Sequence, residues 1–291
     1  MNVKTPAVVV EPLSALIVEP AVKAALLEDF GRGGDLTTEA TIPPHAIAHG
    51  IIAAREPGRI AGIDVAAAAF RLLDPAIKFT IHVPDGADVE RGEVVAVVFG
   101  AARPILSAER VALNFLGRLS GIASATEKLV KLTQGTKTKV VCTRKTTPGL
   151  RVFEKYAVRC GGGRNHRFGL DDGILIKDNH IVAAGGVKNA ILAARKHAGH
   201  MVHVEIEVDG LDQLEEALVH GANTVLLDNM KPDMLREAVK RTAGRATLEA
   251  SGNVTAETIA AIAATGVDLI SSGAITHSAK CLDLGLDFKP L

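Results

Sequence analysis

The chain has 291 residues, which is enough for one large domain or two smaller ones. Its 33 Lys and Arg residues balance 33 Asp and Glu residues, whereas proteins that coat nucleic acid or an anionic membrane carry a basic excess. With no Trp and one Tyr there is little aromatic surface for stacking bases, and 47% hydrophobic residues is too many for a disordered chain. Composition therefore predicts a globular protein and argues against nucleic-acid and membrane-surface binding.

The cysteines and the N-terminal segment bear on where the protein works. Cys142, Cys160 and Cys281 form no CxxC motif, which favours a reducing compartment with ordinary thiols. The apolar N-terminal stretch is interrupted by Pro6, Pro12 and Pro20 and lacks a signal-cleavage pattern. No uncharged apolar run approaches the ~20 residues that span a bilayer. We expect a cytoplasmic protein.

The first part of the chain mixes helices and strands. A run of alanines after Asp64 indicates a tightly packed helix, and glycines between short β-branched runs at Asp85–Gly100 predict a hairpin. Expected helices are Glu19–Phe30, Asp64–Leu73 and Ser107–Leu132, and expected strands are Ala48–Arg55 and Ile77–Val83.

After residue 135 the pattern becomes regular. The steps from Val204 to Val225, Leu248 and Leu269 are 21, 23 and 21 residues, each enough for a strand, a turn and a helix of about three turns. The expected strands are Lys139–Cys142, Ile174–Ile176, Val202–Val208, Thr224–Leu227, Ala246–Leu248 and Val267–Ile270, and the expected helices are Val187–His197, Leu211–His220, Pro232–Thr242 and Ala256–Thr265. Six parallel strands fit a (β/α) barrel, incomplete or not, or an open doubly wound sheet.

Polar residues follow every one of these six strands. Because the carboxyl ends of parallel strands meet at one edge, we expect them to converge on a shared active site. They are Thr143–Thr147, Lys177–His180, the alternating Glu205, Glu207 and Asp209, then Asp228–Asn229, Glu249–Asn253 and Ser271–Gly273.

Charge is concentrated in this region. Residues 139–180 hold nine Lys and Arg against four Asp and Glu, an excess of five in a chain of zero net charge. Arg offers forked donors for carboxylates and Lys a point charge for phosphates. A basic zone in a neutral protein indicates a small polyanionic ligand, in preference to a solvated basic loop.

Other strand ends supply the complementary groups. Glu207 and Asp228 would suit Mg²⁺, which takes one or two carboxylates plus substrate oxygens, or the hydroxyls of a ribose. SGN at 251–253 and SSG at 271–273 open the last two βα loops, where backbone N–H groups can hold a phosphate. No HxH, HExxH, GxSxG, P-loop or strand-linked GxGxxG motif occurs, which argues against zinc and covalent catalysis.

The segment TRKTTPGLRVFEKYAVRCGGGRNHRFGLDDGILIKDNHI, residues 143–181, resembles the signature of the quinolinate phosphoribosyltransferases. EDFGRGGDLTT at 28–38, AERVALNFLGRLSGIA at 108–123, VEIEVDGLDQLEEAL at 204–218, LLDNM at 226–230, EASGN at 249–253 and GAITHSAKCLDLGLDF at 273–288 support it. The resemblance runs from about residue 19 to the C-terminus, with no departure at the charged positions.

This resemblance implies an α/β protein in which an N-terminal α/β sandwich, residues 1–115 joined by the tail 278–291, accompanies an incomplete, catalytic (β/α) barrel of parallel strands, residues 116–277. It also implies a Mg²⁺-dependent reaction of quinolinate with phosphoribosyl pyrophosphate. The products are nicotinate mononucleotide, pyrophosphate and CO₂, on the de novo route to NAD.

The resemblance further assigns residues. Thr143, Arg144, His166, Arg167 and Lys177 would surround quinolinate, and Lys145 would contact both substrates. Glu207 and Asp228 would lie near the ribose hydroxyls and the metal, directly or through water, and with Lys145 form the catalytic set. Ser251, Gly252, Asn253, Ser272 and Gly273 would hold the 5′-phosphate, and Arg110 would reach a neighbouring subunit's site, which implies a homodimer or a hexamer of such dimers.

Two alternatives stay open. The same fold could use another acceptor, either nicotinate or the substrate of the molybdenum-operon paralogues, although the full cationic set exceeds what one carboxylate needs. A non-catalytic sensor of a phosphorylated metabolite is the other alternative, although it would not need the acids Glu207 and Asp228.

Overall fold

The computed structural model describes residue 4 and residues 8–289. Residues 1–3, 5–7 and 290–291 are not described. Part of the N-terminal segment discussed above and the last two residues of the predicted tail therefore lie outside the described residues. The chain forms two compact units. The first comprises residues 1–127, 153–162 and 279–291, and the second residues 128–152 and 163–278. A domain boundary at 115/116 stays a prediction.

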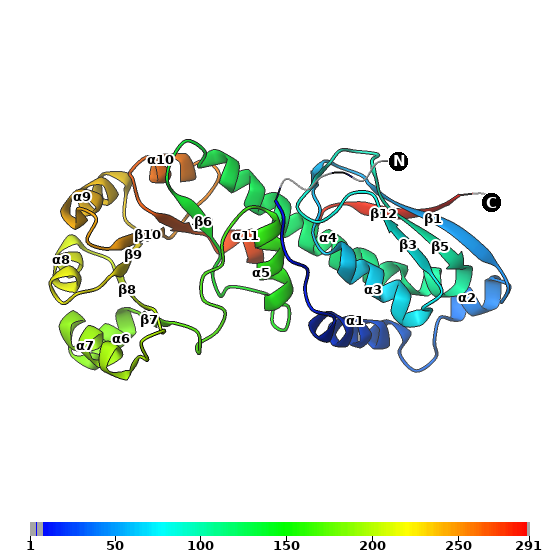
Figure 1. Cartoon of the computed structure of the whole chain (residues 1–291), viewed down its shortest axis with the longest axis horizontal. Coiled ribbons are helices and arrows are strands. Elements are labelled where there is room, and N and C mark those ends of the chain that lie inside the picture. The colour runs from blue at the N-terminus through cyan, green and yellow to red at the C-terminus, as the bar shows by residue number, and fades with distance from the viewer. Residues whose placement is uncertain (1–3, 5–7, 290–291) are drawn as a thin grey trace. The chain divides into compact units, whose positions relative to one another are not determined.

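The first unit is built around an antiparallel sheet in the order β12-β1-β5-β3 (Figure 1). The strands are β1 Ile47–Ala54, β3 Lys78–Ile81, β5 Val94–Ala101 and β12 Leu284–Lys289. β1 alternates between exposed or half-buried and buried residues, the period of a strand with one face on a core. β12 pairs with β1, so the C-terminal tail belongs to this sheet.

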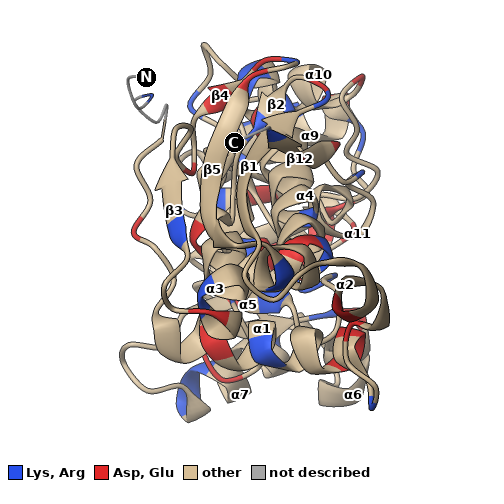
Figure 2. Ribbon diagram, turned by 90° about the vertical axis from the view of Figure 1, so that its right-hand side faces the viewer, with Lys and Arg blue, Asp and Glu red and all other residues tan. Residues whose placement is uncertain are grey.

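The helices of the first unit are α1 Ala15–Phe30, α2 Leu36–Thr41, α3 Ile63–Leu73, and most of α4 Ala102–Leu132 and of α5 Arg151–Cys160. The predicted alanine-rich helix is confirmed as α3, where Ala66, Ala68 and Ala69 are fully buried. α1 begins at Ala15, four residues before the prediction, and continues through Pro20. Pro20 has no backbone N–H, so the hydrogen bond to the Leu16 carbonyl is lost. This loss lies close to the first turn of the helix, where proline is tolerated best. α1 and α3 each carry both signs of charge (Figure 2).

The predicted hairpin at residues 85–100 is wrong. Its two apolar runs form β4, Asp88–Val89, and β5, but they pair with different partners. β4 pairs with β2, Gly58–Arg59, whereas β5 lies between β1 and β3. Glycine-punctuated β-branched runs predict strands, but the pairing partner is set by tertiary packing.

The second unit has a six-stranded sheet in the order β6-β11-β10-β9-β8-β7, in which all neighbouring pairs are parallel. Its strands are β6 Lys139–Val141, β7 Ile174–Ile176, β8 Val204–Val208, β9 Thr224–Asp228, β10 Thr247–Ser251 and β11 Leu269–Ser271. Within the described part of the chain β6 and β7 share no ladder, so the sheet is an open barrel. The predicted α/β class, with an N-terminal unit and an incomplete barrel of parallel strands, is confirmed.

The connecting helices of this unit are α6 Asp178–Ala184, α7 Val187–His197, α8 Leu211–Val219, α9 Pro232–Thr242, α10 Ile259–Ala263 and α11 Ala274–His277. α7, α8 and α9 lie along the outer side of the strands (Figure 1). α10 is shorter than predicted, because the backbone N–H of Thr255 donates to the Thr258 hydroxyl at 2.9 Å and makes the preceding residues a turn.

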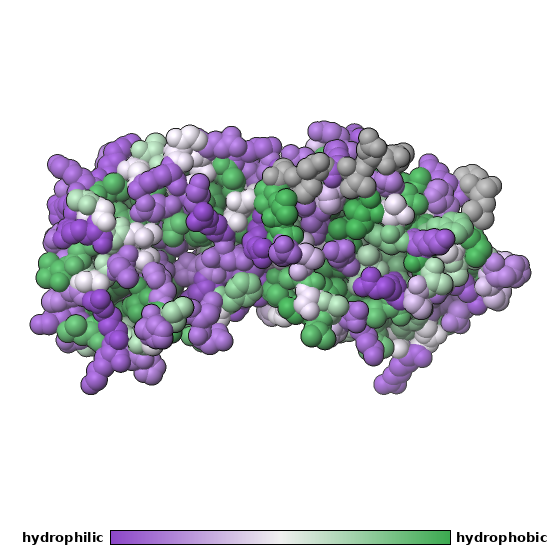
Figure 3. All heavy atoms as spheres, in the orientation of Figure 1, coloured by the Kyte–Doolittle hydropathy of each residue, from purple (hydrophilic) through white to green (hydrophobic). Residues whose placement is uncertain are grey.

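The surface can be examined for hydrophobic patches. Hydrophobic residues are scattered among hydrophilic ones on the face shown in Figure 3, as on ordinary globular proteins. Among the helices of the described residues, none combines the length and apolar character of a membrane span.

Candidate active site

A cavity of about 590 Å³ opens at the carboxyl ends of the strands of the second unit. Most of its lining comes from the six strands and the segments that follow them, as the strand-end polarity predicts, and the loop before β7 adds His166 and Arg167. It is lined by Thr143, Arg144, Lys145, His166, Arg167, Leu175, Lys177, Glu207, Leu226, Asp228, Asn229, Glu249, Ser251, Gly252, Asn253 and Ser271.

The loop after β6 presents Arg144 and Lys145. The Lys145 backbone N–H donates to the Thr143 hydroxyl at 3.0 Å, and the Thr276 hydroxyl donates to the Lys145 carbonyl at 2.7 Å. A Cβ at Gly273 would lie 2.8 Å from Lys145 Cδ, so this glycine leaves room for the lysine side chain. The loop is therefore fixed from two directions while its cations face the cavity.

Arg144 and Arg167 form the cationic wall of the cavity. Arg167 donates Nη1–H to the Gly173 carbonyl at 2.8 Å. The Nε–H groups of both arginines are buried and have no hydrogen-bond partner among the described residues. Burial, followed by the charge of Arg144, lowers the pKa of Arg167. Two half-buried arginines, each with a buried Nε–H that lacks a partner among the described residues, favour an anionic ligand.

The acidic side of the cavity is carried by β8 and β9. Lys177 Nζ lies 3.3 Å from Glu207 Oε2, and Asp228 Oδ2 accepts a hydrogen bond from Asn229 Nδ2 at 2.7 Å. Glu207 and Asp228 both line the cavity, and their donor chemistry fits Mg²⁺, which takes one or two carboxylates and completes its shell with substrate oxygens and water.

A sharply turned loop follows β10. Gly252 has φ +93°, and a Cβ there would collide with the Asn229 side chain. Asn253 has φ 50° and donates Nδ2–H to Asn229 Oδ1 at 3.3 Å. The amides of this loop thus lie beside Asp228 at the cavity rim, in a conformation that requires glycine.

His166 is engaged on both ring nitrogens. Its Nε2 lies 2.9 Å from Glu205 Oε2, and its Nδ1 accepts the backbone N–H of Arg167 at 2.7 Å. Its place in the cavity agrees with the sequence prediction, but its nitrogens bond to the protein.

The cavity unites most of the predicted site residues. Ser272 and Gly273 follow Ser271 and are not in its lining, and Arg110 belongs to the first unit, exposed on α4. Asn229, Glu249 and Ser271 line the cavity as the strand-end pattern predicts, although no substrate role was assigned to them, whereas Leu175 and Leu226 were not predicted to line it. Strand alternation was the available signal, because Glu249, Leu226 and Glu207 occupy one row across β10, β9 and β8.

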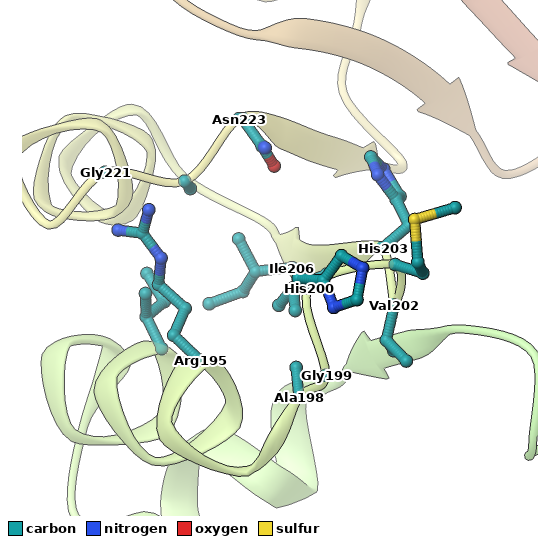
Figure 4. Close-up of a pocket in the computed structure, with 13 residues that line it drawn as sticks. Arg195, Ala198, Gly199, His200, Val202, His203, Ile206, Gly221 and Asn223 are labelled. Carbon is teal, nitrogen blue, oxygen red and sulfur yellow. The ribbon is translucent and has the colours of Figure 1, made fainter.

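A second hollow, of about 410 Å³, lies at the amino ends of β8 and β9 (Figure 4). Its polar side chains Arg195, His200, His203 and Asn223 are exposed. In parallel α/β sheets the chemistry occurs at the carboxyl ends, so this hollow is not the candidate site.

An open parallel barrel with a cationic cavity at its carboxyl edge defines an enzyme that acts on small polyanions. The N-terminal domain model of the quinolinate phosphoribosyl transferases matches residues 35–120, and the C-terminal domain model matches residues 122–287. The chain belongs to the quinolinate phosphoribosyltransferase family.

Individual relatives agree with this. The probable nicotinate-nucleotide pyrophosphorylase [carboxylating] of Bacillus subtilis is 46% identical over 261 residues, covering 90% of each chain. The nicotinate-nucleotide pyrophosphorylase [carboxylating] of Mycobacterium leprae is 44% identical, covering 91% of this chain and 95% of the relative. The crystal structure of NadC from Streptococcus pyogenes has a TM-score of 0.92 at 42% identity, covering 97% and 100% of the two chains.

Proposed function

We propose that this protein transfers the phosphoribosyl group of phosphoribosyl pyrophosphate to quinolinate with loss of CO₂, giving nicotinate mononucleotide and pyrophosphate for de novo NAD biosynthesis. The observation that carries the proposal is the pair of buried, unpartnered Nε–H groups of Arg144 and Arg167 among the described residues of one cavity. A dicarboxylate supplies a partner for each guanidinium, whereas a monocarboxylate leaves one uncompensated.

Quinolinate is assigned to the cationic wall. Its carboxylates would meet Arg144 and Arg167, with Lys177, His166 and Thr143 around the ring. Without substrate, Lys177 is paired with Glu207. On binding, a quinolinate carboxylate would replace the Glu207 carboxylate as the partner of Lys177. The exposure of Lys177 leaves it free to move.

The phosphoribosyl group is assigned to the opposite side. Glu207 and Asp228 would face the ribose hydroxyls, and Lys145 would lie between the two substrates. The segments Ser251–Asn253 and Ser272–Gly273 would hold the 5′-phosphate through backbone N–H groups. The tight turn at Gly252, which leaves no space for a Cβ, supports the assignment of the 5′-phosphate to this loop.

The reaction follows from this placement. The quinolinate ring nitrogen forms a bond to C1′ while the C1′–O bond to pyrophosphate breaks, through a state with positive charge on the ribose that the Glu207 carboxylate stabilises. The bond from C2 to its carboxylate then breaks, its electron pair stays on C2 next to the cationic nitrogen, and C2 takes up a proton. The protein contributes orientation and charge.

Magnesium is part of the same proposal. Glu207 and Asp228 would hold it, directly or through water, and when bound it neutralises pyrophosphate charge in the leaving group. A second cluster of possible metal ligands consists of His166, Glu205 and Glu249. It does not suit the ion, because His166 Nε2 carries a proton, as argued in the next subsection.

The assembly and location complete the proposal. Arg110 is exposed on α4 and would enter the site of a neighbouring copy, so the working form would be a homodimer or a hexamer built from such dimers. Cys142, Cys160 and Cys281, all within the described residues, form no disulfide, which supports a cytoplasmic enzyme.

Acceptor selectivity tests the proposal. The purified protein would be incubated with Mg²⁺, phosphoribosyl pyrophosphate and either quinolinate or nicotinate, and nicotinate mononucleotide would be separated and measured. We expect formation from quinolinate to exceed that from nicotinate by about 100-fold in kcat/KM, as for a charge left unpaired. Equal or preferred use of nicotinate would refute the dicarboxylate assignment.

A further inference from the structure

Three ionisable groups, His166, Glu205 and Glu249, are packed together at the cavity wall. Glu205 and Glu249 are only 5% and 1% exposed. His166 Nε2 lies 2.9 Å from Glu205 Oε2 and 3.9 Å from Glu249 Oε1. The proposed chemistry uses neither glutamate, although Glu249 lines the cavity.

The hydrogen bonds of His166 determine its tautomer. Nδ1 accepts the Arg167 N–H and therefore carries no proton. Nε2 must then be the protonated nitrogen, because an imidazole without a proton on either nitrogen does not occur at ordinary pH, and it donates to Glu205. A protonated Nε2 has no lone pair for a metal, so this group is not a metal centre.

The two glutamates cannot both be charged at low cost. Their nearest oxygens and the His166 nitrogen lie within 4.8 Å of one another. Oε1 of each glutamate is buried without a hydrogen-bond partner in the described part of the chain. Two like charges in a buried site favour binding of one proton. Burial, followed by the charge of Glu205, raises the pKa of Glu249 to about 7.

We propose that Glu249 carries this proton and that Glu249, Glu205 and His166 form a positioning unit for Arg167. Glu205 holds the ring of His166, and the ring holds the Arg167 backbone, which sets where the guanidinium meets a substrate carboxylate. The inference rests on the proposed function and deepens it, because it names two buried glutamates that act on quinolinate binding through His166 and Arg167.

The protonation state of Glu249 then matters for binding. A second negative charge at the cavity offsets the cationic wall and adds an uncompensated charge next to the ring of His166. The neighbouring charged groups on the surrounding elements are Arg144 and Lys145 after β6, Arg167 and Asp172 before β7, Lys177 after it, Glu207 on β8 and Asp228 on β9. The unit therefore favours a dianionic substrate only while Glu249 is neutral.

The test compares the KM for quinolinate between pH 6.5 and 8.5 at saturating phosphoribosyl pyrophosphate. In the wild type we expect the KM to rise about 25-fold, because the neutral, binding-competent form falls from about three quarters to about 3% of the protein. Glu249→Gln, which mimics the protonated carboxyl, should retain the low KM across the range. Glu237→Gln, the same change at a half-buried glutamate of α9 outside the cavity lining, should behave as the wild type.

A second comparison tests the positioning role of Glu205. Glu205→Ala should raise the KM for quinolinate about tenfold at pH 6.5 and leave the KM for phosphoribosyl pyrophosphate within about twofold, as expected when one partner of a buried hydrogen-bonded group is lost. Glu205→Gln, whose amide oxygen can still accept from Nε2–H, should recover most of the loss.

The outcomes separate the two proposals. Absence of quinolinate turnover in the wild type at every pH would refute the proposed function. Turnover with a flat KM, or a rise that persists in Glu249→Gln, would refute the positioning unit. Equal defects in Glu205→Ala and Glu205→Gln, or a matching rise in the KM for phosphoribosyl pyrophosphate, would also refute it.

Discussion

Arg144 and Arg167 share one cavity, and each keeps a buried Nε–H without a hydrogen-bond partner among the described residues. Arg167 reaches this position from the loop before β7 and Arg144 from the loop after β6, two strands at opposite ends of the open sheet. The opening of the barrel thus brings the two arginines to one cavity, and within the described part of the chain neither forms a salt bridge with an acid.

Removing either arginine should therefore weaken binding of the transition state. We expect Arg144→Ala and Arg167→Ala each to lower kcat/KM for quinolinate. The loss of transition-state binding free energy should be about 2–5 kcal/mol, the range for one partner of a buried charge pair. Arg195→Ala, at the opposite ends of the strands, is the matched control and should retain wild-type kinetics. Wild-type kcat/KM in either cavity variant would contradict the assignment.

The loop after β10 should depend on glycine for a reason beyond its backbone angle. At Gly252 an added Cβ meets the Asn229 side chain, whereas at Gly244, with φ +77°, it meets open space. We expect Gly252→Ala to raise the KM for phosphoribosyl pyrophosphate at least about tenfold, and Gly244→Ala only to cost about 1 kcal/mol in unfolding free energy. Equal activity of the two variants in steady-state assays would show that the collision has no consequence.

Asp35 should contribute stability that depends on pH. It caps α2 by accepting the Thr38 N–H at 2.9 Å and also accepts the Ser107 hydroxyl at 2.8 Å. The bonds to Thr38 are the largest cause that lowers the pKa of Asp35 below 3.8. A carboxyl with a lowered pKa stabilises the fold above its unfolded pKa and loses that contribution as pH falls through the folded value.

Asp35→Ala should accordingly lower the unfolding free energy by about 1 kcal/mol at pH 7, with a smaller difference from wild type near pH 2.5. Ser14→Ala removes the cap of α1 by a hydroxyl that does not titrate there, so its cost should not shrink. Urea unfolding at both pH values measures the comparison. A constant cost for Asp35→Ala would exclude the charge contribution.

The proposed role of Arg110 can be tested by mixing inactive variants. Arg110→Ala and Lys177→Ala should each be inactive alone. In a random mixture about half of the dimers are mixed and each contains one intact site, so about a quarter of wild-type activity should return. Activity no higher than the sum of the separate variants would show that Arg110 does not act across a subunit boundary.

Much of the second unit follows from sequence because its βα repeats are local. The strand ends place Arg144, Glu207 and Asp228 on one cavity, as the parallel topology requires. The two engaged nitrogens of His166 could not be foreseen, because its partner Glu205 is set by side-chain packing across the barrel. The pairing of β4 with β2 was likewise beyond a local pattern.

The most direct measurement is release of CO₂ from quinolinate labelled in its 2-carboxylate, with Mg²⁺ and the wild-type protein. The account predicts release that requires phosphoribosyl pyrophosphate and matches nicotinate mononucleotide one for one. Release without phosphoribosyl pyrophosphate, or no release while nicotinate is converted, would contradict it.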